Sequence, residues 1–187
     1  MMTLMIGGSG SGKSAYAEKR ACEASRQENP FKNAPLYYLA TMRVMDEEGK
    51  QKVRRHRVQR GRKGFLTIEQ PANIEEAKVQ IAYGGTVLLE CLSNLAANEM
   101  FSGPSKKDAD RTAADVIRGI RQLSEQAGQL FIVTGQVFED GIAYQEGTKD
   151  YMDALGKINC ELARMADEVI EVVAGIPVVI KKRREES

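Results

Sequence analysis

The stretch "GGSGSGKS", residues 7–14, decides the fold of this chain. It fits the pattern G-x-x-x-x-G-K-[ST], with the apolar run "MMTLMI" (1–6) before it and the helical stretch "SAYAEKRACEAS" (14–25) after it. Glycines let the backbone wrap closely around phosphate groups, and the backbone N–H groups then point inward as an anion cradle. A chance glycine- and serine-rich turn would not be expected to have both flanks. The predicted phosphate-binding residues are Gly7, Gly8, Ser9, Gly10, Ser11, Gly12, Lys13 and Ser14.

Two residues of this loop and one later acid are expected to act on phosphates and a metal ion. Lys13 can reach the outer phosphate oxygens of a nucleotide, and the Ser14 hydroxyl can bind Mg²⁺. Such a site also needs a carboxylate at the end of another buried strand, and Glu90 ends the apolar run "TVLLE" (86–90). An ordinary surface glutamate at a strand end is the alternative. The sequence thus predicts a Mg²⁺ site formed by Ser14 and Glu90.

Short apolar runs alternate with longer amphipathic stretches along the chain. The runs are nearly continuous in Val, Ile, Leu, Phe and Tyr, which is typical of strands covered on both faces. This alternation predicts a three-layer α/β fold with a mostly parallel sheet, in one domain spanning 1–187. Two β-rich runs around Gly175, Ile176 and Pro177 predict an antiparallel strand at the C-terminal edge. The expected strands are 3–6, 36–41, 65–69, 86–91, 130–135 and 168–175, the expected helices are 14–25, 73–83, 108–128 and 152–167, and 100–111 is expected to be a polar surface loop.

Composition sets the broad class. The 187 residues carry a formal net charge of +1, with 42% hydrophobic and 28% charged residues, as ordinary globular proteins do. This balance gives no global reason to expect nucleic acid or a membrane as a partner, and no apolar run approaches the ~20 residues of a membrane-spanning helix. Cys22, Cys91 and Cys160 are widely spaced and odd in number, which indicates reduced thiols. Gly7 and Gly8 interrupt the N-terminal apolar run, unlike a signal peptide, so we expect a cytoplasmic protein.

The segment "KQKVRRHRVQRGRK" (50–63) carries eight Lys or Arg residues, no acid, and the only histidine, His56. As a helix it would place Lys52, His56, Arg60 and Lys63 on one face. Three interpretations are open: a solvated charged face, a nucleic-acid patch, or a stripe facing a polyphosphate. The second is weakened because no aromatic residues interleave with the charges. In the third, neighbouring cations would keep His56 neutral and nucleophilic, and would neutralise the phosphoryl group that it attacks.

Several motifs occur in the order found in one known family. They are "GGSGSGKS" (7–14), "YLATM" (38–42), "RHRVQR" (55–60), "FLTIEQP" (65–71), "LLECLSNLAAN" (88–98), "GKIN" (156–159), "ELARMADEV" (161–169) and "VVAGIPVVIK" (172–181). On these motifs, nearly the whole chain resembles the bifunctional adenosylcobinamide kinase/adenosylcobinamide-phosphate guanylyltransferase family of cobalamin biosynthesis. The combination is much more specific than the phosphate loop alone.

The resemblance implies a RecA-like nucleotide-binding sheet and a homotrimer. It implies phosphorylation of the aminopropanol hydroxyl of adenosylcobinamide with ATP or GTP, followed by transfer of GMP from GTP onto that phosphate. His56 stands where the family carries the histidine through which GMP passes, so the implied catalytic residues are His56 and Lys13. The nucleotide-binding residues implied beside the phosphate loop are Arg57, Arg60, Glu69 and Glu90.

Three departures from the family pattern fall where nucleotide or corrinoid contacts are expected. Residues 135–138 read Gly-Gln-Val-Phe instead of Asn-Glu-Val-Gly, Met152 stands in place of an arginine, and Arg60-Gly61 followed by Phe65 replaces Arg-Pro-x-x-Trp. The alternatives are therefore an enzyme with only one of the two activities, or a nucleotide-binding regulator of the same fold. The regulator is disfavoured because "TKDYMD" (148–153) lacks the correctly spaced aspartate of a guanine-reading [NT]-K-x-D motif.

Overall fold

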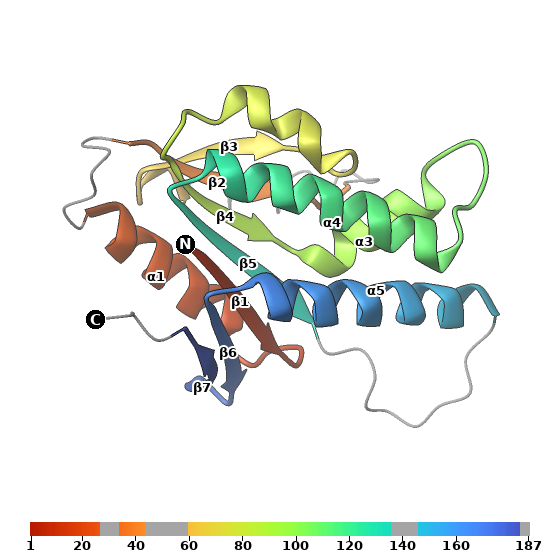
Figure 1. Cartoon of the computed structure of the whole chain (residues 1–187). Helices are drawn as coiled ribbons and strands as arrows, with labels where there is room; N and C mark the ends of the chain where they lie inside the picture. Colours follow the sequence, from red (N-terminus) through yellow and green to blue (C-terminus); the bar gives the residue numbers. More distant parts are fainter. Residues whose placement is uncertain (27–33, 44–59, 136–145, 184–187) are drawn as a thin grey trace.

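Six strands of the sheet run parallel, and the seventh is antiparallel to its neighbour (Figure 1). The computed structural model describes residues 1–26, 34–43, 60–135 and 146–183. Its strands are β1 (Met2–Gly7), β2 (Leu36–Ala40), β3 (Phe65–Glu69), β4 (Thr86–Glu90), β5 (Gln129–Gly135), β6 (Glu168–Val173) and β7 (Ile176–Lys182). Its helices are α1 (Lys13–Arg26), the 3₁₀ helix η1 (Ile74–Gln80), α3 (Leu92–Phe101), α4 (Ala109–Gln126) and α5 (Glu146–Met165).

The strand order is β3-β2-β4-β5-β1-β6-β7, so the first strand lies inside the sheet. β1 pairs in parallel with β5 on one side and with β6 on the other. Parallel strands need crossover connections, and α1, η1, α3, α4 and α5 lie in four of them within the described residues. β7 pairs antiparallel with β6 at the edge. The predicted α/β fold, with a mostly parallel sheet and an antiparallel C-terminal edge strand, is confirmed.

Helix α1 covers one face of the sheet (Figure 1). Its buried residues Ala17 and Ala21 are small and one turn apart, which lets the helix axis approach the strands closely. There they belong to one apolar cluster with Met5 of β1 and Phe131 of β5. This packing fixes the start of α1 at the carboxyl end of β1, where the phosphate loop connects the two.

Helices α4 and α5 lie on the opposite face and pack against each other (Figure 1). The Asp108 side chain caps α4 by accepting a hydrogen bond from the Arg111 backbone N–H at 2.7 Å. Val116, Ile120 and Leu123 then recur at helical spacing and are buried in the second core. The sheet is therefore buried on both faces, which explains its continuous apolar strands.

Three boundaries differ from the sequence-based expectations. The predicted loop 100–111 is shorter, because α3 continues to Phe101 and α4 already begins at Ala109. α5 begins at Glu146 instead of residue 152. The helix expected over 73–83 is a 3₁₀ helix confined to Ile74–Gln80.

The edge strand β7 is apolar and exposed. Ile176, Val178, Val179 and Ile180 leave between 44% and 66% of their surface accessible. An exposed hydrophobic edge strand is a common surface for association with another chain. Within the described ranges, every helix is too short or too polar to cross a membrane.

Candidate active site

The phosphate loop closes on itself between β1 and α1. The Ser11 backbone N–H donates to the Gly8 carbonyl at 3.2 Å, and the Lys13 ammonium donates to the same carbonyl at 2.9 Å. Because α1 begins at Lys13, the partial positive charge of the helix N-terminus adds to the lysine charge. The loop therefore concentrates positive potential where the sequence predicts phosphate binding.

Glycine is required at two loop positions for different reasons. The φ angle of Gly12 is +87°, a left-handed conformation that other residues rarely adopt. A Cβ at Gly7 would lie 2.6 Å from the Val172 carbonyl oxygen and 2.6 Å from Ser11 Oγ, so the obstacle there is contact with β6. The two glycines of the sequence pattern are therefore required for different reasons: Gly12 for its backbone conformation and Gly7 for its tight packing.

The β6–β7 turn supports the phosphate loop from the side. The Gly175 backbone N–H donates to the Ser11 carbonyl at 2.8 Å. A Cβ placed on Gly12 would lie 3.3 Å from the Gly175 Cα. Positive φ angles at Ala174 (48°) and Gly175 (81°) make the tight turn that brings this N–H to the loop. The sequence predicted this turn only as part of a hairpin, and its contact with the loop was not foreseen.

We expect Gly12→Ala to weaken nucleotide binding and to destabilise the fold by about 1–3 kcal/mol, because the new side chain is strained and meets the β6–β7 turn. Urea unfolding and equilibrium binding of a fluorescent nucleotide measure the two effects. Gly147→Ala is the matched control, since a Cβ there has nothing within 4 Å and the residue lies in α5. Wild-type affinity in Gly12→Ala would contradict the account of the loop.

Two acids end strands at the same edge of the sheet. The strand register places Glu69, Ala40 and Glu90 side by side on β3, β2 and β4. β5 separates β4 from β1, so Glu90 lies two strand spacings from the phosphate-loop strand, roughly 10 Å across the sheet. Carboxyl ends of parallel strands are where open α/β sheets bind ligands. The fold thus brings the predicted acids to the same sheet edge as the phosphate loop.

Glu90 is held by a tyrosine of the neighbouring strand. The Tyr38 hydroxyl donates to Glu90 Oε2 at 2.7 Å. Burial, reinforced by the charge of Glu90 and this hydrogen bond, raises the pKa of Tyr38 well above its usual value. The phenol therefore remains protonated and continues to donate. Tyr38 belongs to the motif "YLATM", but no role was predicted for it from the sequence.

Arg60 lies over the same tyrosine. Its guanidinium carbon is 3.5 Å from the centroid of the Tyr38 ring, close enough for a cation–π interaction. Its Nε is 3.9 Å from a carboxylate oxygen of Glu18, which also binds Lys63. Glu18 lies one turn after Ser14 on α1, so Arg60 connects the loop helix to the Tyr38–Glu90 pair.

The other predicted residues are placed as follows. His56 and Arg57 lie outside the described residues, as do residues 136–138 of the departure after β5. Asn159 accepts a hydrogen bond from the Thr134 hydroxyl at 2.9 Å. Met152 lines a groove on the far side of the sheet. The two predicted metal ligands, the Ser14 hydroxyl near the start of α1 and the Glu90 carboxylate at the end of β4, are both oxygen donors, the type that Mg²⁺ prefers.

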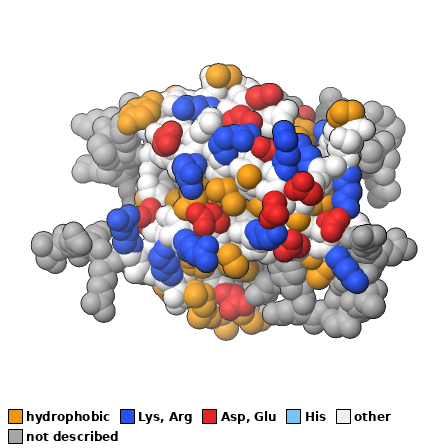
Figure 2. All heavy atoms as spheres, turned by 45° about the vertical axis from the view of Figure 1, so that its right-hand side comes forward, with side chains coloured by type: hydrophobic (Ala, Val, Ile, Leu, Met, Phe, Trp, Pro, Cys, Tyr) orange, Lys and Arg blue, Asp and Glu red, His pale blue; other side chains and the backbone are white. Residues whose placement is uncertain are grey.

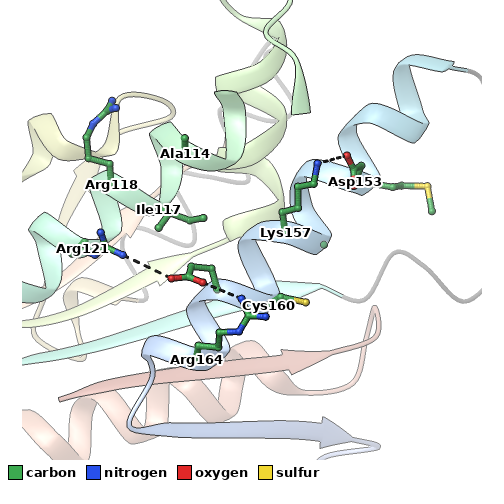
Figure 3. A pocket seen from close by; sticks show the side chains of 11 residues that line it. Ala114, Ile117, Arg118, Arg121, Asp153, Lys157, Cys160 and Arg164 are labelled. Carbon is green, nitrogen blue, oxygen red and sulfur yellow. Dashed lines mark hydrogen bonds and ion pairs between the residues drawn. The ribbon is translucent and has the colours of Figure 1, made fainter. Parts of the chain in front are cut away.

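That groove runs between α4 and α5 (Figure 3). Its lining contains none of the predicted phosphate-loop or acid residues. Its basic side chains are paired with acids: Arg121 and Arg164 with Glu161, Lys157 with Asp153, and Arg118 with Asp115 outside the lining. On the face in Figure 2, the described basic and acidic side chains are interleaved in the same way. The described side chains of this face therefore do not form the one-signed basic patch typical of nucleic-acid binding.

A strand–loop–helix phosphate cradle on a mostly parallel sheet defines a P-loop nucleotide-binding protein. The model of the cobinamide kinase / cobinamide phosphate guanyltransferase family matches residues 3–180, so the chain belongs to this family. It is accordingly an enzyme of cobalamin biosynthesis, a kinase and nucleotidyltransferase, as the sequence motifs predicted.

Two relatives and one solved structure illustrate the similarity. The bifunctional adenosylcobalamin biosynthesis protein CobU of Escherichia coli is 28% identical over 191 residues, which is 97% of this chain and 100% of the relative. The bifunctional adenosylcobalamin biosynthesis protein CobP of Pseudomonas aeruginosa is 26% identical over 183 residues, 97% of this chain and 98% of the relative. A solved ATPase domain superposes with a TM-score of 0.53 at 13% identity, covering 97% of this chain and 77% of that one, and is similar in fold alone.

Proposed function

We propose that the chain phosphorylates adenosylcobinamide with ATP or GTP, and then transfers GMP from GTP onto adenosylcobinamide phosphate through a histidine-bound GMP. The observation that carries the proposal is the common sheet edge of the phosphate loop and Glu90, with Lys13 folded over the loop. Family membership supplies the substrate class.

In the kinase step, backbone N–H groups of the loop and Lys13 bind the phosphates and stabilise the charge of the transferring group. Mg²⁺, when bound through Ser14 and Glu90, would neutralise phosphate charge. The hydroxyl oxygen of cobinamide attacks the γ-phosphorus, the bond from that phosphorus to the oxygen it shares with the β-phosphate breaks, ADP or GDP leaves, and the hydroxyl proton is released. The chain's part is to position the phosphates and to supply positive charge.

In the transferase step, His56 is the proposed nucleophile. An imidazole nitrogen forms a bond to the α-phosphorus of GTP, and pyrophosphate leaves with the electrons of the broken bond. A phosphate oxygen of cobinamide phosphate then attacks the same phosphorus and releases His56. Arg57, Arg60 and Glu69 are proposed to bind the nucleotide during these steps, with Arg60 already ordered against Tyr38 and Glu18.

The proposed assembly is a homotrimer located in the cytoplasm. The exposed apolar edge of β7 supports association, because Ile176, Val179 and Ile180 would lose contact with water at a subunit interface. The number three rests on the family resemblance.

The direct test incubates the protein with adenosylcobinamide, Mg²⁺ and either ATP or GTP, and follows the products by mass. The phosphate ester should appear first, and the GDP-linked product only with GTP. A single product would support the narrower enzyme with one activity, for which the altered residues after Gly135 and at Met152 are the sequence argument. If neither product forms, adenosylcobinamide phosphate is supplied with GTP: the GDP-linked product would then indicate a guanylyltransferase without kinase activity, and no product would leave only the nucleotide-binding regulator.

We expect Glu90→Gln to raise the Mg²⁺ concentration needed for half-maximal turnover by about 10- to 100-fold, because a neutral amide binds a metal or its water ligands less well. A Mg²⁺ titration of the phosphorylation rate measures the change. Glu23→Gln is the control, since Glu23 is an exposed acid of α1 paired with Lys19. An unchanged titration in Glu90→Gln would remove Glu90 from the site.

A further inference from the structure

We propose that Tyr38 is a positioning residue. Its hydroxyl fixes the Glu90 carboxylate at the sheet edge, and its ring holds the Arg60 guanidinium. The two opposite charges then do not pair with each other. This inference rests on the proposed function, in which Glu90 acts on the metal side and Arg60 on the nucleotide side. It assigns a role to a residue of the "YLATM" motif for which the sequence predicted none.

The hydroxyl of Tyr38 sets the position of the acid. β2 and β4 are neighbouring parallel strands, and the register puts Tyr38 opposite Leu88, one same-face position before Glu90. The phenol reaches along the strand to Glu90 Oε2 at 2.7 Å. Tyr38 is only 5% exposed, so its side chain has little freedom to leave this contact. One carboxylate oxygen of Glu90 is thereby held in a fixed position at the sheet edge.

The ring of Tyr38 sets the position of the Arg60 guanidinium. The Arg60 guanidinium stacks over the ring at 3.5 Å, while Phe65 meets the same ring edge-on, with centroids 6.0 Å apart and an interplanar angle of 88°. The Arg60 side chain is only 14% exposed, which is low for an arginine near the surface. A guanidinium stacked on a ring keeps its N–H groups available around its rim.

The choice of a neutral donor has an electrostatic consequence. A hydrogen bond from a phenol stabilises a carboxylate while leaving its full negative charge. An arginine in the same place would neutralise Glu90 and would lose its own charge for phosphate binding. Here Arg60 interacts with the Tyr38 ring and with Glu18 instead. Tyr38 thus contacts both the Glu90 carboxylate and the Arg60 guanidinium, while the ion pair of Arg60 is with Glu18.

The test compares Tyr38→Phe, which removes the hydroxyl and keeps the ring, with wild-type protein. A fluorescent GTP with a methylene group between the α- and β-phosphates is titrated in EDTA and in Mg²⁺, without cobinamide. Tyr38→Phe should bind the analogue with wild-type affinity in EDTA. The factor by which Mg²⁺ increases its affinity should be about tenfold smaller than in wild-type protein. Glu90→Gln should lose the same part, and the double variant should bind no more weakly than Glu90→Gln alone.

Tyr37→Phe is the matched control. Tyr37 is the adjacent buried tyrosine, and its hydroxyl accepts a hydrogen bond from the Ala82 backbone N–H at 3.1 Å on the other face of the sheet. It should unfold in urea much as Tyr38→Phe does, yet keep the full Mg²⁺ effect. A full Mg²⁺ effect in Tyr38→Phe beside a loss in Glu90→Gln would overturn the inference alone. A full effect in both variants would overturn the role of Glu90 as well, and a Tyr38→Phe protein that fails to fold while Tyr37→Phe folds would make the hydroxyl structural.

Discussion

Lys13→Ala should reduce phosphorylation of adenosylcobinamide by at least about 100-fold, because it removes the cation that lies against the phosphate loop. The Lys13 ammonium is held 2.9 Å from the Gly8 carbonyl, inside the turn expected to surround the phosphates. Lys13 is the first residue of α1. Water that replaces its side chain has no net charge, so the positive charge at this position is lost. Initial rates of phosphate-ester formation, measured by mass, give the size of the effect.

The control for this variant is Lys19→Ala. Lys19 lies on the same helix, its side chain is 71% exposed, and it pairs only loosely with Glu23 at 3.9 Å. Surface pairs of this kind contribute little to stability, so the control should fold and turn over normally. If folded Lys13→Ala retains the wild-type rate, the assignment of the loop is wrong.

His56→Asn should abolish GMP transfer and keep at least part of the kinase activity, because only the transferase step needs an imidazole nucleophile. In the wild-type protein, GTP labelled at the α-phosphate should mark the chain covalently in the presence of Mg²⁺. A γ-phosphate label should leave no covalent mark, since that phosphate departs with pyrophosphate. The nitrogen–phosphorus bond should be labile in mild acid and stable in base, unlike a serine ester.

The interpretation of this experiment is simple because the chain has one histidine. No second imidazole can take over the label in His56→Asn. Persistent α-labelling of that variant would rule out the proposed nucleophile. An active wild-type enzyme without any label would instead indicate direct transfer from GTP to the cobinamide phosphate.

The phosphate loop and most strands could be predicted because their signals are local. Gly12 has a positive φ and Lys13 begins a helix, and both properties belong to a few consecutive residues. Helix α3 was missed because its N-cap, Cys91, makes no side-chain capping hydrogen bond and so gives no recognisable start signal. Its position became visible only from the fold.

The supporting residues of the site could not be predicted because their contacts join distant parts of the chain. Tyr38 on β2 binds Glu90 on the neighbouring strand β4. Arg60 contacts Tyr38 from the segment just before β3. A sequence shows an aromatic residue in a strand, but not which later acid the strand register will bring to its hydroxyl. The role of His56 stays a prediction, since that residue lies outside the described ranges.

The contact between Gly175 and the phosphate loop also bears on how the protein is made. β1 pairs with β5 and β6, which both follow it in the chain. The Ser11 carbonyl likewise accepts from the Gly175 N–H of the β6–β7 turn, which is synthesised after the loop. The nucleotide cradle is thus synthesised before the strands and the turn that complete it. We therefore expect nucleotide to stabilise the finished sheet, and not the nascent chain.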